Sequence, residues 1–239
     1  MFHLSRRELL TSTAIMLASS SLVRGTTIKG ALPFVPGRAD PPPDAGIGGW
    51  HYFTAQEGAA VEALVDRLIP PDPETPGGKD SGCAVFIDRQ LAGPYGSSEG
   101  LYVSGPFRDG TPQQGPQSSL TPAQQYRRAL TALDRYCRAA SEGVPFVQLP
   151  DVRKDEIIKG LEDGSLKIDG TQGFFALLLK DTKQGFLADP IYGGNRNMVA
   201  WKIIGFPGAR YDYRDWVDRH NERYPLPPIG INRHPDWAR

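Results

Sequence analysis

The residue types that most often carry chemistry are sparse in this chain, and their spacing forms no catalytic set. The histidines do not pair at the spacing of metal ligands, and two distant cysteines cannot hold an iron–sulfur cluster. The chain contains neither the glycine-rich dinucleotide fingerprint nor the motif for covalent haem. We therefore predict no catalytic residue, cofactor site or metal site in this chain. The histidines concerned are His3, His51, His220 and His234.

One segment formally matches a serine-hydrolase motif. Gly96-Ser97-Ser98-Glu99-Gly100 fits G-x-S-x-G, in which a strand must deliver the serine and a helix must follow it. The flanking residues 91–95 and 101–106 supply neither element, so we interpret the segment as a glycine-serine loop. The carboxylate pairs Glu162-Asp163 and Asp151 with Asp155 are expected on solvated helix faces.

The two cysteines, Cys83 and Cys137, leave three possibilities open. They could form an intramolecular disulfide, which would close a loop of about 54 residues and contribute roughly 4 kcal/mol. One of them could bond to a partner chain. Alternatively, both are small buried apolar residues, because each falls on the apolar side of a predicted helix.

Composition indicates a modest core with much irregular chain around it. Lys and Arg (27) balance Asp and Glu (27) and are scattered, which argues against nucleic-acid binding. Gly (27) and Pro (22) make up about a fifth of the residues, well above the usual ~12%. Only 39% of the 239 residues are apolar, so we expect one domain with extended arms.

The N-terminus reads as an export signal. Arg6 and Arg7 lie in Ser-Arg-Arg-Glu-Leu-Leu, the pattern of a twin-arginine signal, within a signal region at 1–25. The apolar stretch 9–23 is too short and polar to span a membrane stably. The alternative is an ordinary first helix with a chance arginine pair. The twin-arginine (Tat) translocase carries folded cargo, so we expect a periplasmic protein that leaves the cytoplasm already folded.

The elements that follow are helices separated by proline- and glycine-rich loops. After a linker at 26–52, capping boxes at Thr54 and Thr121 predict two sharp helix starts. Apolar spacing predicts the remaining helices, and the segment 93–120 is expected to be a long loop. The predicted helices begin at Thr54 and end at Pro70, span 83–92, run from Thr121 to Gly143, and span 150–161, 174–187 and 198–204.

We therefore predict a mainly α fold: a small irregular helical bundle at 53–208 with long loops and extended N- and C-terminal arms. The arm at 209–239 combines aromatic residues with prolines, and its rings are expected to fold back on the bundle or to fill pockets on a partner. We expect Trp216 to pack internally and the last fifteen residues to reach outward.

Two stretches resemble a known family. Residues 53–57 (FTAQE) with 65–78 (VDRLIPPDPETPGG), and residues 185–209 (GFLADPIYGGNRNMVAWKIIGFPGA), are similar to the opening and the C-terminal signature of the small (third) subunit of gluconate 2-dehydrogenase. The resemblance covers about 53–210. Ala200 stands where glycine is common in similar sequences.

The resemblance implies a supporting role in a complex. Members of this family accompany a large FAD-dependent subunit of the glucose–methanol–choline type, which oxidises a sugar, sugar acid or polyol. A membrane-attached cytochrome c subunit with haem c often takes the electrons. The flavoprotein often lacks its own signal, so the small subunit carries it across the inner membrane and helps it mature. The alternatives are a transient Tat-linked chaperone that leaves the mature enzyme, and an enzyme that acts alone.

The signature also suggests residues for a partner interface. Gly193-Gly194 allows a sharp reversal, the polar residues after it could bond a facing backbone, and Trp201 is a large amphipathic anchor. The alternative is internal turn packing. The candidate interface residues are Tyr192, Asn195, Arg196, Asn197, Trp201, Tyr224 and Trp237.

Overall fold

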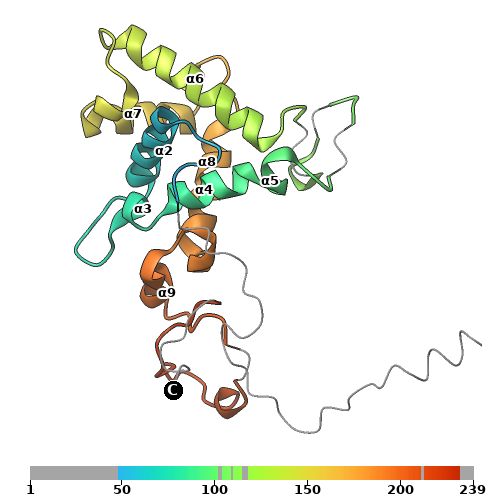
Figure 1. Cartoon of the computed structure of the whole chain (residues 1–239), viewed down its shortest axis with the longest axis vertical. Coiled ribbons are helices and arrows are strands. Elements are labelled where there is room, and N and C mark those ends of the chain that lie inside the picture. Colours follow the sequence, from blue (N-terminus) through green and yellow to red (C-terminus); the bar gives the residue numbers. More distant parts are fainter. Residues whose placement is uncertain (1–47, 102–103, 109, 115–117, 211–212, 232–239) are drawn as a thin grey trace, which may run out of the picture. The chain divides into compact units, whose positions relative to one another are not determined.

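The computed structural model describes residues 48–101, 104–108, 110–114, 118–210 and 213–231. Every described residue belongs to one compact unit, which lies within Pro36–Arg239. The predicted signal with Arg6 and Arg7, most of the linker, and Trp237 therefore lie outside the described residues. The described part is mainly helical (Figure 1), which confirms the predicted fold class.

The two capping boxes begin helices where predicted. In α2 (Ala55–Leu68), the Thr54 hydroxyl accepts from the Glu57 amide at 3.2 Å, and the Glu57 carboxylate accepts from the Thr54 amide at 2.9 Å. The same reciprocal pair of bonds joins Thr121 and Gln124 ahead of α6 (Pro122–Ala140). Each box satisfies backbone donors that a helix start leaves free.

The other predicted helices are also present, and two short ones were not predicted. The helices α4 (Cys83–Ala92), α7 (Asp151–Glu162), α8 (Phe174–Leu187) and α9 (Val199–Ile204) match the expected segments. The helices α3 (Gly77–Asp80) and α5 (Pro94–Ser97) lie in segments where no helix was expected. Short 3-10 turns occupy several connections: η1 (Pro112–Gln114), η2 (Phe146–Gln148), η3 (Pro190–Tyr192), η4 (Arg196–Met198) and η5 (Arg214–Trp216).

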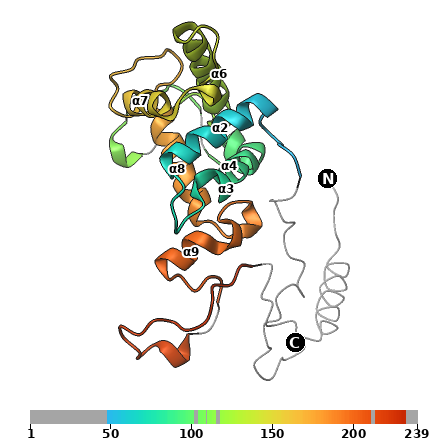
Figure 2. The ribbon, with the colours of Figure 1, turned by 90° about the vertical axis from the view of Figure 1, so that its left-hand side faces the viewer.

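The core lies where α2, α4, α6, α7 and α8 meet. The helix α8 packs on α4 and α7, and its C-terminal end leads through η3 and η4 to α9 (Figure 1, Figure 2). Tyr126 is fully buried at the centre, with its ring 5.4 Å from that of Phe174 and 6.1 Å from that of Phe53. These aromatic contacts join α6, α8 and the segment that enters α2.

A buried carboxylate fixes the point at which the described chain enters the bundle. The Asp88 side chain has no exposed surface and accepts from the amides of His51 (2.8 Å), Tyr52 (2.9 Å) and Phe53 (2.9 Å). It also forms an ion pair with Arg89. Burial of a charge is tolerated only when it is paired and hydrogen-bonded, and here four groups satisfy it.

A second buried carboxylate, Asp181 on α8, ties α5 and α6 to that helix. It accepts from the hydroxyls of Tyr95 (2.9 Å) and Tyr126 (3.0 Å), and Lys180 lies 3.4 Å away. Desolvation raises the pKa of Asp181 against the lowering effect of Lys180 and of these hydrogen bonds. Burial and the Asp181 charge likewise raise the pKa of both tyrosines.

The structure favours the interpretation of the two cysteines as buried apolar residues, and it places Asp151 and Asp155 in surface ion pairs. Cys83 and Cys137 are unbonded and buried, as small apolar residues of α4 and α6. Burial raises the pKa of the Cys83 thiol to about 12 and that of Cys137 to about 11. On the surface, Asp151 and Asp155 both form ion pairs with Arg67, at 3.1 and 2.6 Å.

Ser98 lacks the setting of a hydrolase nucleophile. The helical turn α5 precedes it, where the motif requires a strand. Its backbone caps that turn in the left-handed region, with φ 59°. The hydrolase motif is therefore not supported, although Gly96 and Ser97 lie in α5 and not in the expected loop.

Candidate partner-binding surface

The signature (residues 185–209) begins in the last turn of α8 and continues through a turn built around Asp189, here called the signature turn. The Asp189 carboxylate caps η3 by accepting from the Ile191 amide at 3.0 Å, and Pro190 prevents α8 from continuing. Gly193 then takes φ 92°, the left-handed conformation expected of it. Gly194 is needed for a different reason: its backbone packs directly against that of α8, and a Cβ at this position would lie 2.1 Å from the Gly185 carbonyl oxygen.

Asn195 and Trp201 are internal, which corrects their assignment to the partner interface. Asn195 is fully buried; its amide nitrogen donates to the Ala188 carbonyl and its amide oxygen accepts from Ala200, both at 2.9 Å. Trp201 is 5% exposed and its indole donates to the Leu187 carbonyl at 2.8 Å. Both side chains join α9 to the end of α8, so the internal-packing alternative holds for them. Ala200 fits this tight contact, with no exposed surface.

Tyr192, Arg196 and Asn197 do face solvent. The Arg196 amide donates to the Ser81 carbonyl at 3.0 Å, so the loop that carries these side chains rests on the turn before α4. Asn197 and Met198 take left-handed backbone conformations, with φ 57° and 55°. Such conformations persist in residues other than glycine only when surrounding contacts hold them, so this loop presents a fixed surface.

The C-terminal arm does not simply reach outward, which corrects the expectation for part of it. Residues 223–231, here called the strap, return to the signature turn. The Ile229 amide donates to Pro207 at 3.2 Å, the Ala209 amide donates to Ile229 at 2.7 Å, and Ile229 is 1% exposed. The Ile231 amide then donates to the second oxygen of Asp189 at 2.8 Å. One carboxylate therefore holds both the signature turn and the end of the strap.

The aromatic residues of the arm pack against one another, an arrangement that the sequence did not predict. The Tyr224 ring lies 5.1 Å from that of Trp216 and 5.8 Å from that of Tyr213. The Arg210 guanidinium lies 5.0 Å from the centre of the Tyr224 ring and donates to the Pro227 carbonyl at 2.6 Å. This small cluster supports the start of the strap.

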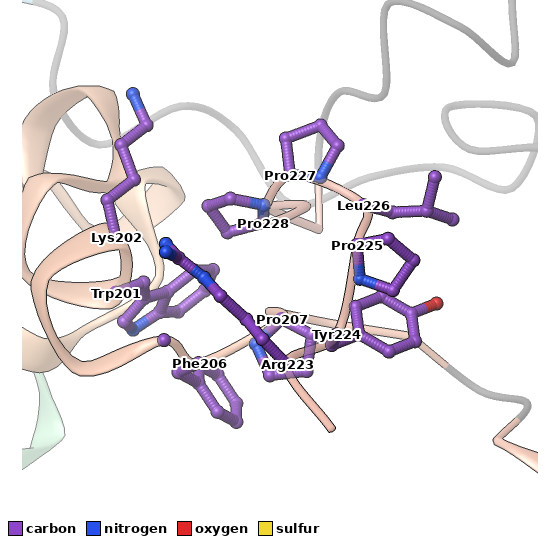
Figure 3. A pocket seen from close by; sticks show the side chains of 11 residues that line it. Trp201, Lys202, Phe206, Pro207, Arg223, Tyr224, Pro225, Leu226, Pro227 and Pro228 are labelled. Atoms are coloured by element: carbon purple, nitrogen blue, oxygen red, sulfur yellow. The ribbon is translucent and has the colours of Figure 1, made fainter. Parts of the chain in front are cut away.

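A groove with a volume of about 480 Å³ lies between α9 and the strap (Figure 3). Trp201, Lys202 and Phe206 come from α9 and the turn after it. The opposite side is formed by the strap residues Arg223, Tyr224, Pro225, Leu226, Pro227 and Pro228. The groove is thus mostly apolar, with a cation from each side.

Large apolar side chains are exposed on the segments that form this groove. Ile203 and Ile204 on α9 are 51% and 62% exposed, and Phe206 and Leu226 are also exposed. We call these four residues the α9–strap surface. A group of exposed apolar side chains next to a polar-rimmed groove is typical of a protein-binding site.

The described residues contain no group of three His, Cys, Asp or Glu side chains arranged to hold a metal ion. In the same part of the chain, none of the helices has the length and apolar character needed to cross a bilayer.

Comparison with protein families identifies the chain. The model of the family described as gluconate 2-dehydrogenase subunit 3 matches residues 55–208, which include α2 to α9 and the whole signature turn. No curated protein and no solved structure matches the chain significantly. The match extends over more than half of the sequence, and the chain therefore belongs to the gluconate 2-dehydrogenase subunit 3 family.

Proposed function

We propose that this chain is a non-catalytic subunit that binds a large FAD-dependent dehydrogenase subunit through the α9–strap surface. In this role it supports the folding, export and stability of a periplasmic sugar, sugar-acid or polyol dehydrogenase. The FAD belongs to the large subunit, and haem c belongs to a membrane-attached cytochrome c subunit that receives the electrons. The family match supports a dehydrogenase complex, and the exposed surface supports a binding role for this chain within it.

The observation that carries the proposal is the contrast between the two ends of α9. Ala200 and Trp201, near its start, are buried against the end of α8, whereas Ile203 and Ile204, at its C-terminal end, are largely exposed. Burying an exposed isoleucine side chain contributes about 1.5–3 kcal/mol. A six-residue helix has little stability of its own, so its firm attachment suits the presentation of these two side chains to a partner.

The binding test compares two surface substitutions of the same kind. The double variant Ile203→Lys/Ile204→Lys removes apolar area from the α9–strap surface, whereas Val152→Lys changes a side chain that is 73% exposed on α7. Tagged full-length chains are purified from the source organism, and bound flavoprotein is measured by its flavin absorbance. We expect wild type and Val152→Lys to retain the flavoprotein and the double variant to lose at least about 90% of it. Isolation of the wild-type chain alone would contradict the proposal.

The export role is tested separately at the signal. Changing Arg6 and Arg7 to Lys should trap both this chain and the flavoprotein in the cytoplasm, and normal export of the flavoprotein would refute this role. Size-exclusion of the mature enzyme decides whether the chain is permanent. An active enzyme without this chain would favour the transient assembly chaperone.

A further inference from the structure

We propose that the groove between α9 and the strap binds a segment of the dehydrogenase subunit in which an apolar side chain stands next to a carboxylate. This inference rests on the proposed function and specifies the chemistry of the contact. It follows from the lining of the groove, from two cations that line it and have no carboxylate partner among the described residues, and from the way the strap is fixed.

The lining selects an apolar side chain. Pro225, Pro227 and Pro228 have no backbone N–H, so this wall lacks backbone donors at three of its positions. The Pro227 carbonyl is already occupied by Arg210. Figure 3 shows Trp201 and Phe206 on one side of the groove and Pro225 and Leu226 on the other. An aromatic or aliphatic side chain would be buried among these groups, whereas a polar one would lose its hydration without compensation.

The cations at the edge select a carboxylate. Lys202 and Arg223 both line the groove, and among the described residues neither has a carboxylate within ion-pair distance. The nearby Arg219, by contrast, is paired with Glu222 at 3.8 Å. A third cation, Arg210, stands beside Tyr224, and its buried Nε has no hydrogen-bond acceptor in this part of the chain. The whole chain has balanced charge, so these cations form a local excess of positive charge at the groove. A carboxylate of the partner would complement this charge.

The strap is fixed before any partner arrives. Backbone bonds at Ile229 hold one stretch of it to residues 207–209, and Asp189 holds Ile231. At the other end, Tyr224 packs on Trp216. Preformed walls reduce the ordering entropy that binding must overcome, so the groove is suited to recognising an extended segment.

Photocrosslinking in the assembled complex tests the location. Leu226 is exposed on the strap, so it can be replaced by photoreactive benzoylphenylalanine in the tagged full-length chain. We expect an adduct with the flavoprotein, and peptide mapping should place the attachment beside an apolar residue with an Asp or Glu next to it. The same replacement at Val152 on α7 should give no adduct.

Charge reversal tests the chemistry. Lys202→Glu/Arg223→Glu should weaken binding of the flavoprotein at least about tenfold at low salt, and added salt should reduce the difference. Lys167→Glu, which changes an exposed lysine in the loop between α7 and α8, should leave binding unchanged. Circular dichroism confirms that each variant remains folded.

The outcomes separate this inference from the proposed function. If the flavoprotein co-purifies with the wild-type chain but Leu226 gives no adduct, or if charge reversal has no effect, the groove inference is overturned. The subunit role and the contact at Ile203 and Ile204, which the Ile203→Lys/Ile204→Lys variant tests, then still stand. An adduct within this chain's own residues 232–239, or with a second copy, would also overturn it. If no flavoprotein co-purifies with the wild-type chain, both fail.

Discussion

Gly208 is the position at which a single methyl group should detach the strap. Its φ is 81°, and a Cβ built on it would lie 2.1 Å from the Ile229 carbonyl oxygen and 2.5 Å from the Ile229 nitrogen. Both obstacles are backbone atoms, which cannot rotate away as a flexible side chain can. Gly208→Ala therefore requires Ile229 to move.

The expected loss follows from what Ile229 contributes. An alanine in the left-handed conformation costs about 1–2 kcal/mol. Displacement of Ile229 also breaks two backbone hydrogen bonds, each worth about 1 kcal/mol, and exposes a side chain whose burial contributes about 1.5–3 kcal/mol. These losses fall on a strap held by few contacts, so we expect local release while the helical core stays folded.

Amide hydrogen exchange measures this release directly. In Gly208→Ala, protection of the Ala209, Ile229 and Ile231 amides should fall at least about a hundredfold, while amides of the core helices keep wild-type rates. Gly205→Ala is the matched control, because Gly205 also has a positive φ (70°) but nothing lies within 4 Å of its built Cβ. Wild-type protection at Ile229 in Gly208→Ala, or equal loss in both variants, would refute the reasoning.

Three further predictions concern the body of the protein. Asp88→Asn removes a charged acceptor from buried amide donors and should lower the free energy of unfolding by about 2–4 kcal/mol in urea titration; a change below about 0.5 kcal/mol would contradict the role of Asp88. Because the folded-state pKa of Asp181 is raised, its contribution to stability is complete below its unfolded pKa of about 4 and is lost as pH rises through the folded pKa. Asp181→Asn should therefore flatten the fall in stability above about pH 4, and a mutant-to-wild-type difference independent of pH would contradict this. Cys83 and Cys137, buried and with raised pKa values, should resist iodoacetamide in the native protein and react after unfolding; rapid native labelling would show that they are accessible.

Local signals in the sequence predicted the helices well. The capping boxes at Thr54 and Thr121 are complete within four residues, so the beginnings of α2 and α6 follow from short-range chemistry. The helices α4, α7 and α8 follow from apolar spacing. The short helices α3 and α5 escaped notice because neither has a side-chain cap, and each lies among glycines and prolines that indicate a loop.

The candidate site was only partly predictable, because composition does not reveal the direction of a side chain. Asn195 and Trp201 have the polar and amphipathic character of interface residues, yet both donate to carbonyls at the end of α8 in the same chain. The dependence of the strap on Asp189 joins residues 42 positions apart, and no local pattern indicates it. The pair Asp189-Pro190 is typical of a helix start, and this signal could have identified Asp189 as a capping residue.

The central claim is that the dehydrogenase subunit contacts α9 and the strap, and lysine crosslinking of the native complex tests it most directly. Lys202 adjoins the α9–strap surface, whereas Lys167 lies in the loop between α7 and α8. The account predicts that mass spectrometry finds crosslinks from Lys202 to the flavoprotein and none from Lys167. Crosslinks from Lys167 with none from Lys202 would place the partner elsewhere and contradict the account.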